Sequence, residues 1–283
     1  MTHTDTDHPE AVEANIYTAY AEALAFLGNS LLSPMSQTLD VGLRAEFWMA
    51  FPDFCDKEVR RALDNLAHYA QAFNPDDLST NAQTFGMQGL SHAQGASGVE
   101  GLPRAQASMR DAQFFLEDTV VGIDPVTAVS VEFTHLFVGP PSPAAAPWET
   151  FYRDKEVTSG FGHPTLEMRK ALREVGLQVS NKNNQYDDHI GIELLYISTL
   201  CSSAASSLEE SSNPTTGKES DVDKGCVGGI TTSGIKFIQI HPLSWIEKFH
   251  EAIRKEAKGG YYDNLVSLTQ ALLYSLVTYA RQR

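Results

Sequence analysis

The chain has 283 residues and a formal net charge of −15, with 21 Lys and Arg against 36 Asp and Glu. Hydrophobic residues make up 42% of the sequence and charged residues 20%. A chain of this length and composition buries a large core when it folds, so a collagen-like, low-complexity or wholly disordered protein is excluded. The acidic balance disfavours nucleic acid as a partner, because nucleic acid is bound mainly through Lys and Arg, and it favours a cationic partner.

Cysteine usage and the chain ends bear on the compartment. Cys55, Cys201 and Cys226 form no C-x-x-C pair, so we expect neither a disulfide framework nor a zinc clip. Residues 1–30 lack a basic start followed by an unbroken apolar core, so we expect no secretory signal and a cytoplasmic location. The most apolar stretch, 264–280, falls short of about 18 consecutive apolar residues, which predicts a bundle helix without stable membrane insertion.

Helical periodicity runs along the chain. Apolar residues three or four apart, with capping residues or prolines at helix starts and glycines at helix ends, predict helices at about 8–28, 39–50, 59–73, 125–137, Pro164–Gly176, 188–208, Pro242–Gly259 and 261–279. No long alternation of apolar and β-branched residues with polar ones is present. The prediction is an all-α fold, a single helical bundle of roughly nine to twelve helices that covers residues 1–283.

Several segments are expected outside helices. Residues 1–8 are predicted to be a flexible terminus, and 79–102 and 206–234 to be mobile loops, because they are rich in small and polar residues. Residues 138–160 combine prolines and aromatic residues, which favours a packed, functional loop or hinge. Such a hinge permits domain swapping, so a monomer and a domain-swapped dimer both remain open.

Enzyme chemistry has little support. Glu132 and His135 have the E-x-x-H spacing of di-iron bundles, but no second such pair exists, and His189 and Glu193 stand in reverse order. An ordinary pair on a helix surface is the favoured interpretation, and a helical-bundle metalloenzyme that uses these four residues is kept as the alternative. The sequence has no nucleophile elbow and no phosphate-binding glycine motif, so we expect no catalytic residue, metal or cofactor.

Two segments are not explained by composition. The first comprises 133–140 (FTHLFVGP) and 146–152 (APWETFY), and the second is 186–195 (YDDHIGIELL). In the second segment, Asp187 or Asp188 can cap a helix that is apolar on two sides and therefore mostly buried. The acids and the histidine at its start thus either cap the helix or line a polar pocket.

Together these segments resemble the TorD/DmsD family of cytoplasmic redox-enzyme maturation chaperones. The pattern is Leu-Phe-x-Gly-Pro, then Pro-Trp followed by an aromatic residue, then a helix that begins with Asp-His. It is densest over 125–200 and is carried by Leu136, Phe137, Gly139, Pro140, Pro147, Trp148, Tyr152, Asp188, His189 and Glu193.

The resemblance implies an all-helical protein without catalytic activity. It implies binding of the twin-arginine signal peptide, and often the body, of a molybdenum-cofactor oxidoreductase of the DMSO/TMAO reductase type until the cofactor is loaded. Such a peptide joins two arginines to an apolar stretch, so its receptor needs carboxylates beside an aromatic-lined groove. The residues expected to bind it are Leu136, Phe137, Gly139, Pro140, Trp148, Glu149, Tyr152, Asp187, Asp188, His189 and Glu193.

Each of these residues also has a structural interpretation. Core packing is an equally good interpretation for Phe137 and Trp148, and a turn is the favoured one for Gly139 and Pro140. For Asp188 the capping and ligand roles can coexist. His189 is expected to be the one residue of the motif whose charge changes near neutral pH.

Overall fold

The structure is a computed structural model that describes residues 9–72, 124–153, 161–179, 185–212 and 229–282. Throughout these ranges the regular structure is helical, with no strand, and one isolated antiparallel bridge pairs Trp148 with His189. The predicted all-α fold is confirmed. The predicted terminus 1–8 and loop 79–102 lie outside the described residues.

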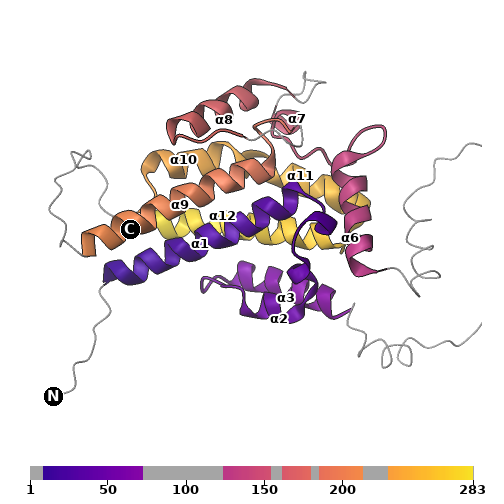
Figure 1. Cartoon of the computed structure of the whole chain (residues 1–283), viewed down its shortest axis with the longest axis horizontal. Helices are drawn as coiled ribbons and strands as arrows, with labels where there is room; N and C mark the ends of the chain where they lie inside the picture. Colours follow the sequence, from indigo (N-terminus) through magenta and orange to yellow (C-terminus); the bar gives the residue numbers. More distant parts are fainter. Residues whose placement is uncertain (1–8, 73–123, 154–160, 180–184, 213–228, 283) are drawn as a thin grey trace, which may run out of the picture.

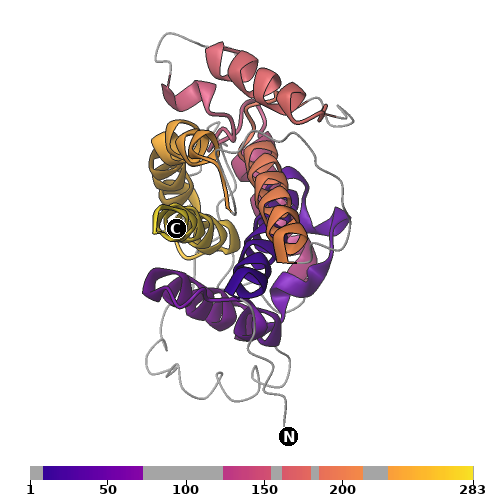
Figure 2. The ribbon, with the colours of Figure 1, turned by 90° about the vertical axis from the view of Figure 1, so that its left-hand side faces the viewer.

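Four long helices form the body of the molecule: α1 (Pro9–Leu32), α9 (Ile190–Ser212), α11 (Pro242–Ala257) and α12 (Tyr261–Arg281). The shorter elements are η1 (Met35–Gln37), η2 (Asp40–Leu43), α2 (Ala45–Ala50), α3 (Lys57–Gln71), α6 (Pro125–Phe133), the π-helical turn η3 (Thr134–Val138), α7 (Thr150–Arg153), α8 (His163–Glu174) and α10 (Thr232–Ile240). Figure 1 shows α1, α9 and α12 running through the centre, with α2 and α3 below them and α7 and α8 above. In the view turned by 90°, α8 lies at one end of the molecule and α3 at the other (Figure 2).

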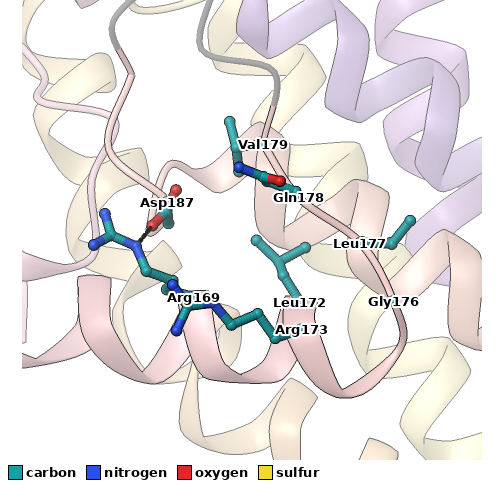
Figure 3. A pocket seen from close by; sticks show the side chains of 8 residues that line it. All are labelled: Arg169, Leu172, Arg173, Gly176, Leu177, Gln178, Val179 and Asp187. Carbon is teal, nitrogen blue, oxygen red and sulfur yellow. Dashed lines mark hydrogen bonds and ion pairs between the residues drawn. The ribbon is translucent and has the colours of Figure 1, made fainter.

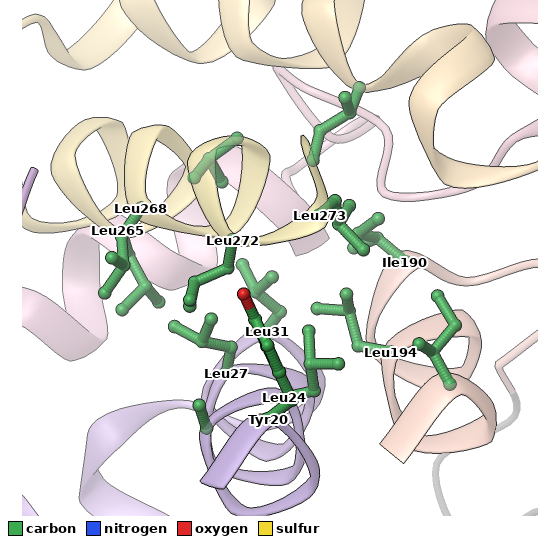
Figure 4. Close-up of a cluster of buried hydrophobic side chains, with 14 of the residues drawn as sticks. Tyr20, Leu24, Leu27, Leu31, Ile190, Leu194, Leu265, Leu268, Leu272 and Leu273 are labelled. Atoms are coloured by element: carbon green, nitrogen blue, oxygen red, sulfur yellow. The ribbon is translucent and has the colours of Figure 1, made fainter. Parts of the chain in front are cut away.

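The core lies where α1, α9 and α12 meet (Figure 4). Fully buried side chains from the three helices face one another there: Leu24, Leu27, Leu31, Ile190, Leu194, Leu265, Leu268 and Leu272. Helices α1 and α9 pack closely through two glycines, because a Cβ on Gly28 would lie 2.8 Å from the carbonyl oxygen of Gly191. Larger residues at these two positions would push the helices apart.

Helix starts and ends follow the predicted signals. The Asp124 carboxylate accepts a hydrogen bond from the backbone N–H of Thr127 and caps α6, which begins with Pro125. Helices α8 and α11 begin beside the predicted prolines. Gly176, just after α8, has a φ of +73°, the left-handed conformation that glycine adopts at helix ends.

Two helical segments near the N-terminus differ from the prediction. Helix α1 continues beyond residue 28 to Leu32, because Leu31 is still buried in the core. The helix expected over 39–50 is divided into η2 and α2 at Arg44, whose backbone is extended. The Trp48 indole donates to the Gly42 carbonyl at 2.8 Å and holds the divided segment together.

The predicted loop 206–234 is also shorter than expected. Helix α9 runs on to Ser212, because buried Leu208 prolongs its apolar stripe, and α10 begins at Thr232. Residues 213–228 lie outside the described residues, as do 154–160 of the predicted hinge. Among the described helices, none is long and apolar enough to cross a membrane.

Candidate functional site

The two motif segments, far apart in the sequence, are joined through their backbones. The Glu149 N–H donates to the Asp188 carbonyl at 3.0 Å, and the Ile190 N–H donates to the Pro147 carbonyl at 2.9 Å. These bonds flank the bridge between Trp148 and His189. The start of α7 and the start of α9 therefore form one structural unit.

Asp188 is fully buried and ties this unit to α8. Its Oδ2 accepts hydrogen bonds from the Thr150 backbone N–H at 2.9 Å and from the Thr150 hydroxyl at 2.6 Å, and its Oδ1 accepts from the Thr165 hydroxyl at 2.9 Å. Burial raises the pKa of Asp188, and the hydrogen bonds from the two threonines oppose that rise. Because both carboxylate oxygens are engaged, Asp188 positions α7 and α8 against the start of α9.

Asp187 forms an ion pair with Arg169 of α8 at the edge of the unit. The Arg169 Nε donates to Asp187 Oδ2 at 2.5 Å, as Figure 3 shows. The guanidinium also lies 6.0 Å from the ring centre of Phe161, within range of a cation–π contact. The pair borders a cavity of about 580 Å³, whose walls also include Leu172, Arg173 and residues 176–179.

A second cavity, of about 640 Å³, adjoins the first. The two share Leu172 and residues 177–179, and the second extends between the end of α1 and α9. None of its lining residues is charged: Asn29, Leu32, Ser33, Leu172, Leu177, Gln178, Val179, Gln185, Ile192, Leu195, Tyr196, Ser198 and Thr199. The unit formed by the starts of α7 and α9 therefore lies beside a cavity without charged lining residues.

Glu149 and Glu193 belong to this unit, and their buried carboxyl groups lie next to His241. Glu149 Oε1 accepts from Arg153 at 2.6 Å, and Glu149 Oε2 lies 2.8 Å from His241 Nδ1. Glu193 Oε2 accepts from the Trp245 indole at 3.3 Å, whereas Glu193 Oε1 is buried and accepts no hydrogen bond from the described residues; the Glu193 side chain also hydrogen-bonds with Glu149. Burial, reinforced by the nearby Glu149 and Asp188 carboxylates, raises the pKa of Glu193 well above its ordinary value.

The aromatic residues of the motif divide into a buried group and an exposed one. Leu136 and Phe137 are buried in the core, where the Phe137 ring packs against Phe133, Phe249 and Tyr262. Half-buried Tyr152 stacks on Trp245 with ring centres 5.3 Å apart. Phe137 and Tyr152 both contact Phe249, which joins the motif segment to α11.

The exposed group is an aromatic cluster formed by Trp148, Phe151 and Tyr186. Half-buried Trp148 lies 5.8 Å from Phe151 and 5.9 Å from Tyr186, measured between ring centres. Phe151 and Tyr186 are 40% and 37% exposed. Both residues lie within the motif segments, but apolar periodicity does not mark them as surface residues, whereas their exposure in the fold does.

The turn before the unit depends on Gly139. Its φ is +84°, and a Cβ there would lie 2.4 Å from the Ser142 backbone, so a larger residue does not fit. Pro140 follows it on the surface. In this structure both residues shape the chain between η3 and α7.

His189 is buried, and this burial lowers its pKa to about 3. Its Nδ1 accepts a hydrogen bond from the Gly191 N–H at 3.0 Å. The expectation that the charge of His189 changes near neutral pH is therefore wrong. The ring is neutral and acts as an acceptor at the start of α9.

The alternative metalloenzyme site is not supported. Glu132 accepts hydrogen bonds from the backbone N–H groups of Tyr261 and Tyr262 at the start of α12. His135 pairs with Glu256 of α11 at 3.4 Å. Glu132 and His135 therefore serve a different junction of the fold from His189 and Glu193.

Comparison with known proteins identifies the family. The model of the family described as "Nitrate reductase delta subunit" matches residues 103–251, more than half of the chain and both motif segments. The chain belongs to this family. The motifs predicted a resemblance to the TorD/DmsD chaperones, and relatives of this chain with those names confirm it.

Three such relatives are chaperones by name. Chaperone protein TorD of Vibrio cholerae serotype O1 is 26% identical over 150 residues, which cover 53% of this chain and 61% of the relative. The probable Tat proofreading chaperone DmsD of Haemophilus influenzae is 23% identical over 141 residues, 50% of this chain and 56% of the relative. The Tat proofreading chaperone DmsD of Salmonella typhi is 37% identical over 65 residues, 23% of this chain and 31% of the relative. The chain thus spans less than two thirds of these relatives, and no solved structure matches it.

Proposed function

We propose that this family member is a cytoplasmic chaperone without catalytic activity. It binds the twin-arginine signal peptide of a molybdenum-cofactor oxidoreductase of the DMSO/TMAO reductase type and assists the maturation of that enzyme before export. The observation that carries the proposal is the family match over both motif segments. Relatives named as Tat proofreading chaperones support it.

The apolar part of the signal peptide has a matching surface in the exposed aromatic cluster of Trp148, Phe151 and Tyr186. Aromatic side chains bury much apolar area and lose little conformational freedom on binding. Phe151 and Tyr186 are about two fifths exposed, and a bound peptide would remove this apolar surface from water. Half-buried Tyr152, the neighbour of Phe151 in α7, stacks on Trp245 and anchors this surface to α11.

The cationic part of the peptide has a matching group in Asp187. The carboxylates of Glu149, Asp188 and Glu193 are fully buried, whereas the Asp187 side chain keeps 12% of its exposure and faces a cavity. An arginine of the peptide reaches Asp187 by exchange with Arg169, whose own side chain is 44% exposed. The net charge of −15 attracts a cationic peptide from a distance.

A binding titration tests the proposal. A fluorescently labelled twin-arginine leader is titrated with the full chain, and its anisotropy is followed at low and high salt. We expect binding to weaken with salt and remain measurable, because salt screens charges beyond about 8–10 Å at 0.1–0.15 M and does not oppose apolar burial. A leader with both arginines replaced by glutamine should bind less well.

A matched pair of variants tests the assigned surface. Phe151→Ser should weaken leader binding, whereas Tyr274→Ser should leave it unchanged, because Tyr274 is also exposed but lies on α12. Absence of leader binding by the parent chain would overturn the proposed function. Binding that ignores both the arginines and Phe151 would overturn the proposed surface and leave a less specific chaperone.

A further inference from the structure

We propose that Glu149, Glu193 and His241 form a binding site for a divalent cation, with zinc as the ion that suits them best. Glu149 directly precedes α7, Glu193 lies in the first turn of α9, and His241 joins α10 to α11. Each offers one ligand atom, and these atoms all lie within 4.8 Å of one another. The inference does not rest on signal-peptide binding.

The two carboxylates are already oriented as metal ligands. In each of them one oxygen is held by a donor, Arg153 on Glu149 Oε1 and the Trp245 indole on Glu193 Oε2. The other oxygens are Glu149 Oε2, which is bonded to His241 Nδ1, and Glu193 Oε1, which is buried and accepts no hydrogen bond from the described residues. In metal sites such outer donors fix the orientation of ligating carboxylates and leave the second oxygen for the ion.

The imidazole is held in place as well. The His241 ring stacks on Phe237 with ring centres 4.4 Å apart and is only 7% exposed. The neighbouring Phe237 and the start of α11 restrict its rotation, so Nδ1 stays directed at Glu149. The cation would thus connect the start of α7, the start of α9 and the junction of α10 with α11.

The charge of the buried cluster favours a cation. Three buried carboxyl groups, those of Glu149, Asp188 and Glu193, lie near one another, and Arg153 contributes one guanidinium at their edge. A buried carboxylate needs a compensating positive charge or a proton. A cation bound between Glu149 and Glu193 would supply that charge.

The ligand set selects among cations. Zinc accepts carboxylate oxygen at about 2.0–2.2 Å and imidazole nitrogen at about 2.0–2.1 Å, which places neighbouring tetrahedral ligand atoms about 3.3 Å apart. His241 Nδ1 and Glu149 Oε2 are 2.8 Å apart and share a hydrogen bond, so zinc takes the place of the shared proton, which moves to Nε2 or to solvent as the two atoms separate slightly. Calcium and magnesium prefer sets made entirely of oxygen, so the histidine disfavours them.

Titration of the tag-free full chain with Zn²⁺ tests the site. The protein is first dialysed against a chelator, and binding is measured by calorimetry at pH 7.5. We expect one zinc per chain and a higher melting midpoint with zinc, since a ligand that binds only the folded state stabilises it. Glu193→Gln should lower zinc affinity at least tenfold, and His241→Gln should lower the affinity similarly.

A control separates this site from zinc on other histidines. His250→Gln removes a different buried histidine, which bonds Asp263 at 2.7 Å, and it should leave zinc affinity unchanged. Helical circular dichroism confirms that each variant is folded, and if His241→Gln is not, Glu193→Gln decides alone. No saturable zinc binding by the parent, or binding that Glu193→Gln leaves unchanged, would overturn the inference. Leader titrations run in chelator keep this result separate from the proposed function.

Discussion

The Thr150 hydroxyl donates a hydrogen bond of 2.6 Å to the Asp188 carboxylate, and both side chains are fully buried. This contact joins the residue two before α9 to the first residue of α7, and the Thr165 hydroxyl extends it to α8. Three donors converge on one carboxylate, so the aspartate satisfies polar groups that would otherwise be buried without partners. Asp188 therefore holds the aromatic cluster and Asp187 in their relative positions.

Replacement of Asp188 should destabilise the fold. Asp188→Ala leaves the Thr150 N–H and two hydroxyls without their acceptor, which we expect to cost about 2–4 kcal/mol of unfolding free energy. Asp188→Asn keeps one acceptor but turns an amide donor toward other donors, and should cost about 1–3 kcal/mol. Urea denaturation followed by circular dichroism measures both.

Asp187→Asn is the matched control for this series. It removes an ion pair whose arginine is 44% exposed, and such pairs contribute less than about 1 kcal/mol. If Asp188→Ala costs no more than Asp187→Asn, the three hydrogen bonds do not support the site. A destabilised variant of Asp188 should also bind the leader less well, because the aromatic cluster and Asp187 are no longer held in position and not because a contact between Asp188 and the peptide is lost.

Glu132 gives the protein a pH-dependent stability. It caps α12 from α6, and burial raises its pKa from 4.5 to about 7. Between pH 4.5 and about 7 the folded state therefore holds a proton that the unfolded state releases, so this group lowers stability as the pH rises through that window. Above about pH 7 both states are ionised and the loss is complete.

Glu132→Gln should remove this dependence, because the amide oxygen still accepts a hydrogen bond and cannot ionise. As the pH rises from 5 to 8, the unfolding free energy of the parent should fall by about 1–3 kcal/mol relative to that of the variant. Denaturation midpoints at the two pH values measure the difference, with Glu256→Gln, a 39% exposed glutamate on α11, as the control. Parallel pH profiles for the parent and Glu132→Gln would contradict the assignment.

The sequence predicted what local patterns determine. The helices α3, α6, α11 and α12 follow from apolar spacing and from capping residues close by in the chain. The sequence also predicted that Asp187 or Asp188 caps the helix that follows, but Asp188 caps α7 instead. That contact joins residues 38 apart, and no local pattern reveals which backbone N–H an aspartate will meet.

His241 and its neighbours show the same limit more strongly. Its contact with Glu149 spans 92 residues, and neither residue belongs to a metal-ligand spacing. Similarly, the π-helical turn after α6 and the break at Arg44 arise where tertiary packing overrides apolar periodicity. The segments of the site are therefore visible in the sequence, whereas the exposure and the pairing of their side chains depend on the fold.

Arg169 should compete with the signal peptide for Asp187. Arg169→Gln leaves the Asp187 carboxylate without its guanidinium, so we expect leader affinity to rise about three- to tenfold at low salt. Asp187→Asn should lower the affinity, and the double variant should resemble Asp187→Asn. Anisotropy titrations of the labelled leader measure all three.

Arg173→Gln is the control for that series, because Arg173 lines the same cavity without an ion pair to Asp187. It tests whether the gain comes from a general loss of positive charge. An equal gain in Arg169→Gln and Arg173→Gln would show that Asp187 is not the group that the peptide reaches.

His189 should stay neutral through the physiological range. Its pKa is about 3 in the folded protein, whereas an exposed histidine has a pKa of about 6.5. The unfolded state therefore binds a proton that the folded state does not, and the stability present above pH 6.5 is lost as the pH falls toward 3.

His189→Asn keeps an acceptor for the Gly191 N–H and cannot ionise in this range. As the pH falls from 6.5 to 5, this variant should therefore lose about 1–2 kcal/mol less unfolding free energy than the parent. His135→Asn, at a 40% exposed histidine, is the control, and nitrogen-15 spectra of the imidazole report its protonation directly. Titration of the His189 ring near pH 6.5 would mean that water reaches it and that the start of α9 is more open than the structure shows.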